Sequence, residues 1–213
     1  MKNRLLTVAI SLSLSACVMP AGSLKATSKS AGNAVASPSA ARLAKNGSAF
    51  DKTLSLQGVS FQVTSPNAGS INTLRIQPSG LKADNALIER QIEGSVTNAE
   101  VADLNVDGSP ELYVYVTSAG SGSYGSLVAY SANQGKSLSE IFLPPLEEDK
   151  NAAKGYMGHD EFAVVENMLV RRFPVYKDGD TNAKPTGGTR QIQYKLKAGE
   201  AGWVLRPDQT VNY

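Results

Sequence analysis

The chain has 213 residues, of which 41% are hydrophobic and 19% charged, with one cysteine, one histidine and a formal net charge of +2. One histidine and one cysteine exclude the usual zinc sites, and a lone cysteine excludes a disulfide within the chain. From Phe50 onward there are 15 basic and 19 acidic residues, a net charge of −4, which disfavours nucleic-acid binding.

The first 17 residues have the pattern of an export signal. Lys2 and Arg4 precede the apolar run LLTVAISLSLS, which is too short to span a membrane as a stable helix. The run ends in LSAC, which resembles the lipobox of bacterial lipoproteins. We therefore expect residues 1–17 to direct export to the periplasm and Cys17 to be lipidated, giving an anchor in the outer membrane as the only membrane contact. The alternative is an ordinary signal peptide in which Cys17 has no role.

Residues 18–49 are rich in alanine, serine, glycine and lysine and contain no aromatic residue. Such a composition buries too little apolar surface to offset the entropy of ordering. It therefore predicts a flexible tether between the signal peptide and a domain over residues 50–213.

From Phe50 onward the chain reads as short strands separated by turn signals such as PNAG, DGSP, ANQG and KDGD. Helical periodicity is nearly absent, and residues 146–153 are the best candidate for a short surface helix. This pattern predicts an all-β fold, an antiparallel β-sandwich of about eight to ten short strands with at most one short helix. Exposed strand edges in such a sandwich can pair with a second copy of the chain, so a homodimer is compatible with this fold.

The segment DLNVDGSPE places oxygen-bearing side chains at its first, third, fifth and ninth positions: Asp103, Asn105, Asp107 and Glu111. With a glycine at the sixth position, this spacing can bring several oxygens to one Ca²⁺ ion, as in integrin-type loops. The twelfth position lacks the glutamate of an EF-hand, and a strand follows instead of a helix. A turn whose Asp and Asn side chains cap their own backbone is favoured over the ion site, and no metal or cofactor is assigned. A calcium-binding structural or adhesion module of the cell envelope remains the alternative function.

The segment SAGSGSYGS, residues 118–126, separates two strongly β segments, ELYVYVT and LVAYSA. A plain hairpin needs only about two to five loop residues. Here eight of nine residues are small and the one large side chain is Tyr124. The loop is suited to insertion into a cleft, with Tyr124 filling a groove on a partner. The alternative is a hairpin tip whose tyrosine folds back onto the sheet.

Enzymatic function is not expected. The single histidine, His159, lies beside Asp160 and Glu161 in a predicted loop, and the chain contains no G-x-S-x-G motif. The neighbouring arginines Arg171 and Arg172 alternate across a strand, so only one of them faces any given partner.

Two segments, residues 107–141 and 171–196, resemble the periplasmic inhibitors of invertebrate-type (i-type) lysozyme. This resemblance implies a β-rich exported bacterial protein that blocks peptidoglycan hydrolysis by a host lysozyme, with the i-type as the expected partner. In these and related families a Ser-Gly…Tyr loop enters the active-site groove of the lysozyme. Carried over by position, the partner-binding residues are Ser121, Gly122, Ser123 and Tyr124. Related families place two residues between the glycine and the tyrosine, whereas this chain has Ser123 alone.

Overall fold

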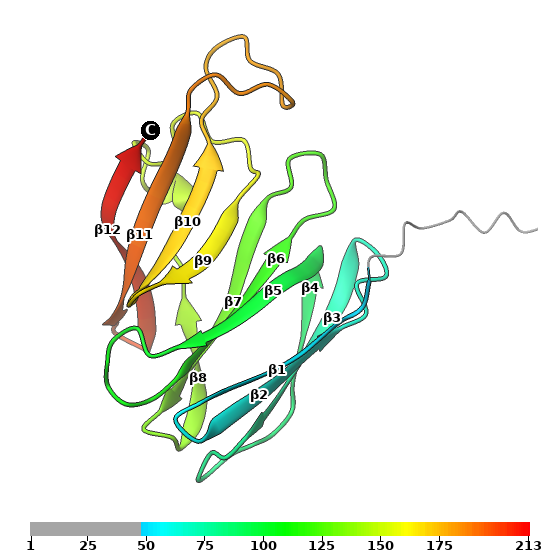
Figure 1. The fold of residues 1–213 in the computed structure, drawn as a ribbon, viewed down its shortest axis with the longest axis vertical. Helices are drawn as coiled ribbons and strands as arrows, with labels where there is room; N and C mark the ends of the chain where they lie inside the picture. Colours follow the sequence, from blue (N-terminus) through cyan, green and yellow to red (C-terminus); the bar gives the residue numbers. More distant parts are fainter. Residues whose placement is uncertain (1–47) are drawn as a thin grey trace, which may run out of the picture. The chain divides into compact units, whose positions relative to one another are not determined.

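The computed structural model describes residues 48–213, which are nearly all β-structure (Figure 1). They form twelve strands and one short 3-10 turn, Leu146–Glu148, so the predicted all-β sandwich is confirmed and the predicted helix is a single turn. Within these residues no helix is long and apolar enough to cross a membrane. The predicted signal peptide, the lipidation of Cys17 and almost all of the predicted tether lie outside the described residues.

The first four strands form one antiparallel sheet in the order β1-β2-β3-β4. A two-residue turn joins β1 to β2, and both of its residues, Gln57 and Gly58, have positive φ (50° and 81°). Such turns match the right-handed twist of the paired strands. The strands are β1 (Phe50–Leu56), β2 (Val59–Ser65), β3 (Ile71–Ser79) and β4 (Ile88–Glu93).

The remaining eight strands form a second sheet in the order β5-β6-β7-β8-β12-β11-β10-β9. Its neighbours are antiparallel except at β8 and β12, which run parallel through two residue pairs, Ile141–Trp203 and Phe142–Val204. The purely antiparallel expectation does not hold at this junction. The strands are β5 (Ser95–Ala102), β6 (Glu111–Thr117), β7 (Gly125–Asn133), β8 (Ser137–Phe142), β9 (Glu161–Val165), β10 (Met168–Pro174), β11 (Thr189–Ala198) and β12 (Trp203–Asn212).

The central strands are covered on both faces, by the first sheet on one side and by β9–β12 on the other (Figure 1). Strand β6 shows this most clearly because its first six residues are all buried. Alternation along the strand sends Leu112, Val114 and Val116 into the first core and Tyr113 and Tyr115 into the second. One strand thus contributes to two hydrophobic cores.

We expect Leu112→Ala to lower the free energy of unfolding by about 2–5 kcal/mol, because it opens a cavity in the first core. Leu112 lies on β6, the strand that also contributes to the second core. Ile71→Ala is the control: its side chain is 64% exposed on β3, and the expected cost is below about 1 kcal/mol. Urea unfolding followed by circular dichroism measures both. Equal effects of the two substitutions would contradict the burial of Leu112 in the first core.

Candidate partner-binding site

The loop Ser118–Tyr124 joins β6 to β7 beyond their last residue pair, Thr117–Gly125 (Figure 1). Gly125 and Ser126, the last two residues of the predicted loop, already belong to β7. Inside the loop, the Ser123 N–H donates to the Gly120 carbonyl at 3.0 Å, and Ser123 has a φ of 44°. The loop therefore contains a tight turn directly before Tyr124.

Hydrogen bonds hold the loop backbone to two other segments of the chain. The Gly122 carbonyl accepts from the His159 N–H at 2.7 Å. The Ser121 carbonyl accepts from the Asn182 side-chain amide, also at 2.7 Å. At the base, Ser118 closes the loop, since its hydroxyl accepts from the Tyr124 N–H at 2.9 Å. The loop is thus a braced protrusion with a defined backbone course.

The Tyr124 side chain packs against the protein on one side and is exposed to solvent on the other. Its ring packs edge-on against Tyr156 with 5.7 Å between ring centroids, and Tyr156 packs in the same way on Phe173 at 4.8 Å. Its side chain nevertheless remains 49% exposed. One edge of the ring is therefore supported by the protein, while about half of the side chain remains exposed.

Two glycines make this close arrangement of the loop possible. A Cβ atom on Gly122 would lie 2.3 Å from Cε2 of Tyr124. A Cβ atom on Gly158 would lie 2.0 Å from the Gly122 carbonyl oxygen, and Gly158 has a φ of +91°. The tyrosine ring and the neighbouring segment can approach the loop because both positions lack a side chain.

The hydroxyl groups of the loop face no partner in the protein. Within residues 48–213, the side-chain oxygens of Ser121, Ser123 and Tyr124 form no hydrogen bond, while Ser121 and Tyr124 are exposed. The structure places the four predicted site residues together on one short turn. What it leaves available to a partner is three hydroxyls and the outer half of an aromatic ring.

A buried ion pair lies under the loop. Arg171 Nε donates to Asp160 Oδ1 at 2.7 Å, and the side chains are 7% and 0% exposed. The other carboxylate oxygen, Oδ2, accepts from the Gly125 N–H at 2.7 Å and from the Tyr156 hydroxyl at 2.6 Å. Burial disfavours the charge of Arg171, but the Asp160 carboxylate outweighs it and raises the pKa of Arg171. This pair ties the first residue of β7 to strand β10.

Sequence reasoning missed the role of this pair. It considered Asp160 only beside His159 and gave Arg171 no partner of its own. The signal was present in β10, where alternation places Arg171 on the same face as the buried apolar residues Leu169 and Phe173. His159 Nε2 lies 3.0 Å from the Asn182 side-chain oxygen, so the histidine and the acid beside it hold the loop in place.

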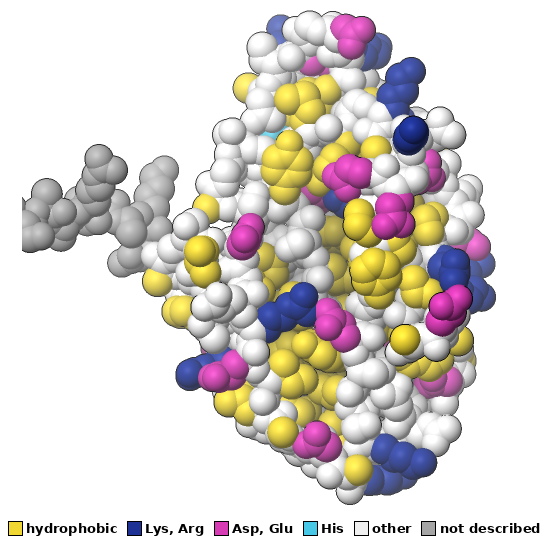
Figure 2. All heavy atoms as spheres, turned by 180° about the vertical axis from the view of Figure 1, so that it is seen from behind, with side chains coloured by type: hydrophobic (Ala, Val, Ile, Leu, Met, Phe, Trp, Pro, Cys, Tyr) yellow, Lys and Arg dark blue, Asp and Glu magenta, His cyan; other side chains and the backbone are white. Residues whose placement is uncertain are grey.

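A groove of about 390 Å³ opens beside the loop. It is lined by Tyr124 and the start of β7, by Phe142 with residues 143–147, and by Tyr156 and Arg171. Figure 2 shows hydrophobic side chains gathered in patches on one face of the molecule, with basic side chains scattered among acidic ones. That face presents no continuous basic area of the kind that binds nucleic acid.

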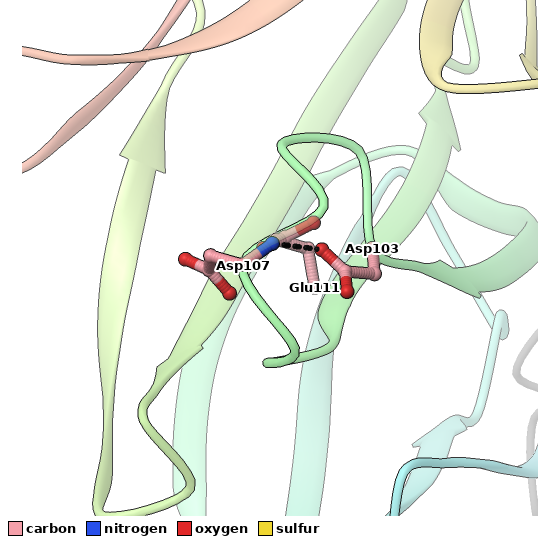
Figure 3. A group of neighbouring side chains, drawn as sticks. All are labelled: Asp103, Asp107 and Glu111. Atoms are coloured by element: carbon pink, nitrogen blue, oxygen red, sulfur yellow. Dashed lines mark hydrogen bonds between the residues drawn. The ribbon is translucent and has the colours of Figure 1, made fainter.

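The segment of residues 103–111 brings three carboxylates together at the other end of β6 (Figure 3). One oxygen from each of Asp103, Asp107 and Glu111 lies within 4.8 Å of the others. The predicted backbone capping is present, since Asp103 Oδ1 accepts from the Asp107 N–H at 3.0 Å and Asp107 Oδ1 from the Ser109 N–H at 2.8 Å. Burial, with repulsion from the two aspartates, raises the pKa of Glu111 to about 8.

The structure thus has a braced loop with an exposed tyrosine on a β-sandwich. The family model described as periplasmic lysozyme inhibitor of I-type lysozyme matches residues 63–153. Over these residues, which include β6, the loop and β7, the chain is similar to this family of periplasmic lysozyme inhibitors. Searches of curated proteins and of solved structures gave no match.

We expect Arg171→Met to lower the free energy of unfolding by about 3–5 kcal/mol, because it leaves the buried Asp160 carboxylate without its countercharge. Arg172→Met is the matched control on the same strand: Arg172 hydrogen-bonds the neutral Gln191 side chain, and its loss should cost no more than about 1 kcal/mol. Chemical denaturation at neutral pH compares them. If Arg171→Met lowers the free energy of unfolding no more than Arg172→Met does, the Asp160–Arg171 pair does not stabilise this part of the fold.

Proposed function

We propose that this protein inhibits a lysozyme by inserting the turn Ser121–Tyr124 into the active-site groove of the enzyme, and that it selects the i-type. The observation that carries the proposal is the half-exposed Tyr124 on a braced loop within the part of the chain that matches the inhibitor family. Inhibition then consists of occlusion, with no bond made or broken.

The bracing supports insertion on energetic grounds. A loop that is already ordered loses little conformational freedom on binding, so more of the contact energy appears as affinity. Tyrosine adds a large rigid surface with only two side-chain torsions. The support from Tyr156 keeps the ring from collapsing along the sheet. Tyr124 is therefore suited to occupy a sugar subsite.

Ser121 supplies the polar part of the proposed contact. A glycosidase groove holds two carboxyl groups around the scissile bond, and an exposed serine hydroxyl can hydrogen-bond one of them where the glycosidic oxygen would lie. Hydrogen bonds to a charged group contribute about 1.5–3 kcal/mol. Because the Ser121 carbonyl is held by Asn182 at 2.7 Å, its position on the loop is fixed before the partner arrives.

One turn is too small to form the whole interface, since a stable complex buries roughly 800 Å² on each partner. Two further exposed apolar side chains are candidates for the rest of it. Phe142, 57% exposed, lines the same groove, and Met157, 38% exposed, follows the supporting Tyr156. We assign these two residues to the rim of the interface. The net charge of −4 from Phe50 onward would speed encounter with a basic lysozyme.

The first experiment measures residual peptidoglycan lysis by invertebrate-, chicken- and goose-type lysozymes with the wild-type protein and with Ser121→Ala/Tyr124→Ala. We expect selective inhibition of the invertebrate type and its loss in the double variant. Tyr124→Ala alone should weaken binding by about 2–4 kcal/mol, or roughly 30- to 900-fold, if the ring fills a subsite.

The control for Tyr124→Ala is Leu87→Ala, because Leu87 is 47% exposed against 49% for Tyr124 and lies before β4 in the other sheet. Its inhibition constant should equal that of the wild type. Full inhibition by the double variant would move the site away from the loop. Failure to slow any of the three lysozymes would remove the proposed function.

Gly122→Ala tests whether the position of the tyrosine ring matters. The new methyl group would lie 2.3 Å from the Tyr124 ring and displace it, without backbone strain, since Gly122 does not have a left-handed φ. We expect inhibition to weaken by about tenfold, the equivalent of 1.4 kcal/mol, with little change in melting temperature. Gly120→Ala is the control within the loop, because a Cβ atom there meets nothing within 4 Å. Equal inhibition by both variants would show that the ring position is not needed.

A further inference from the structure

We propose that residues 103–111 hold a Ca²⁺ ion through Asp103, Asn105, Asp107 and Glu111, and that this ion joins the end of β5 to the start of β6. The inference is independent of the lysozyme partner, because it concerns the end of β6 opposite the Tyr124 loop. The loop of residues 103–111, here called the acidic loop, has side-chain oxygens at positions one, three, five and nine with Gly108 at position six.

The structure brings these positions together, as the spacing alone could not show. One oxygen each from Asp103, Asp107 and Glu111 lies within 4.8 Å of the others (Figure 3). Gly108, with a φ of +81°, provides the left-handed residue that lets the loop curl. When all three are ionised, carboxylates at this separation repel one another, and a cation among them would offset that repulsion. Within residues 48–213 none of the three forms an ion pair with a lysine or arginine.

Glu111 provides the second, independent observation. Its side chain is fully buried, and Oε1 has no hydrogen-bond partner within the described residues. Oε2 accepts only from the Leu104 N–H, at 2.8 Å. A buried carboxylate with an unpartnered oxygen is costly, and buried carboxylates are normally paired or coordinate a metal. A cation bound beside Asp103 and Asp107 would remove this cost.

The hydrogen bonds already present leave room for an ion. Asp103 accepts N–H groups from Asp107 and Gly108 and the side-chain amide of Gln57. An ionised carboxylate has about four acceptor positions, so these bonds do not use all of its lone pairs. The Asn105 amide donates to Asp107 Oδ2 at 2.8 Å, and this bond would be replaced if that oxygen bound the ion.

The donor set favours calcium among the common ions. All four side chains offer oxygen, which suits Ca²⁺ and Mg²⁺ and disfavours zinc, with its preference for sulfur and nitrogen. Mg²⁺ demands near-ideal octahedral geometry and retains several waters. A curled loop with one long, buried glutamate suits the larger ion, which accepts irregular coordination.

The proposed ion would act on the fold. Asp103 directly follows β5 and Glu111 opens β6, while Gln57 from the β1–β2 turn donates to Asp103 at 2.8 Å. The ion would therefore join β5 to β6 within one sheet. It would also fix the Asp103 carboxylate, to which Gln57 in the β1–β2 turn of the other sheet donates. The Tyr124 loop begins seven residues further on, at the far end of β6, roughly 20 Å away.

The test uses the exported chain after dialysis against a chelator. Titration calorimetry with CaCl₂ should show one site with a dissociation constant of about 10⁻⁵ to 10⁻³ M. The melting temperature should rise by several degrees with millimolar Ca²⁺, more than with equal Mg²⁺, because the ion binds only the folded state. Asp107→Asn should weaken Ca²⁺ binding at least tenfold, while Asp178→Asn, at an exposed aspartate outside the loop, should leave it unchanged.

Glu111→Gln keeps the inference testable if Asp107→Asn disturbs the loop. The amide has nearly the shape of the glutamate side chain and cannot ionise, so this variant should fold with or without Ca²⁺ and should lose most of the calcium-induced shift. Two results would overturn the inference: no binding heat together with equal melting temperatures in Ca²⁺ and chelator, or an undiminished shift in both Asp107→Asn and Glu111→Gln.

Discussion

The burial of β6 on both faces is the constraint on which the rest of the structure depends. Its side chains alternate between two cores, and neither core is complete without it. A strand held in this way is rigid along its whole length. Its two ends are consequently the most firmly positioned places for a loop, and they carry the acidic loop at the start and the Tyr124 loop at the finish.

The Asp160–Arg171 pair connects the end of the Tyr124 loop, at Gly125, to strand β10. A buried ion pair adds little net stability over an apolar pair of the same size, but it demands one geometry. Here Oδ1 of Asp160 binds Arg171, while Oδ2 receives the Gly125 N–H and the Tyr156 hydroxyl. Each of these bonds places a group that contacts or precedes the loop. The pair therefore positions the loop and defines the ring against which Tyr124 rests.

The sequence was informative wherever a signal is local. Alternation and turn residues predict the strands, and the small residues around Tyr124 single out the loop. The spacing of Asp103 to Glu111 indicates oxygens on one curl but not that Glu111 is buried, since burial depends on β10 to β12 covering β6. The parallel contact of β8 with β12 and the inward course of Arg171 likewise depend on segments distant in the chain, whose pairing no local pattern encodes.

The bracing also determines how the Tyr124 loop can recognise a partner. An exposed loop with free N–H and carbonyl groups could bind by adding a strand to another sheet. In this loop the Ser121 and Gly122 carbonyls and the Ser123 and Tyr124 N–H groups are already bonded within the protein. Under the proposed function, recognition would therefore fall to the side chains. A concave groove with polar groups at its floor fits such a tip, whereas a flat sheet edge does not, and this favours an enzyme cleft over a second β-sheet as the surface that the loop meets.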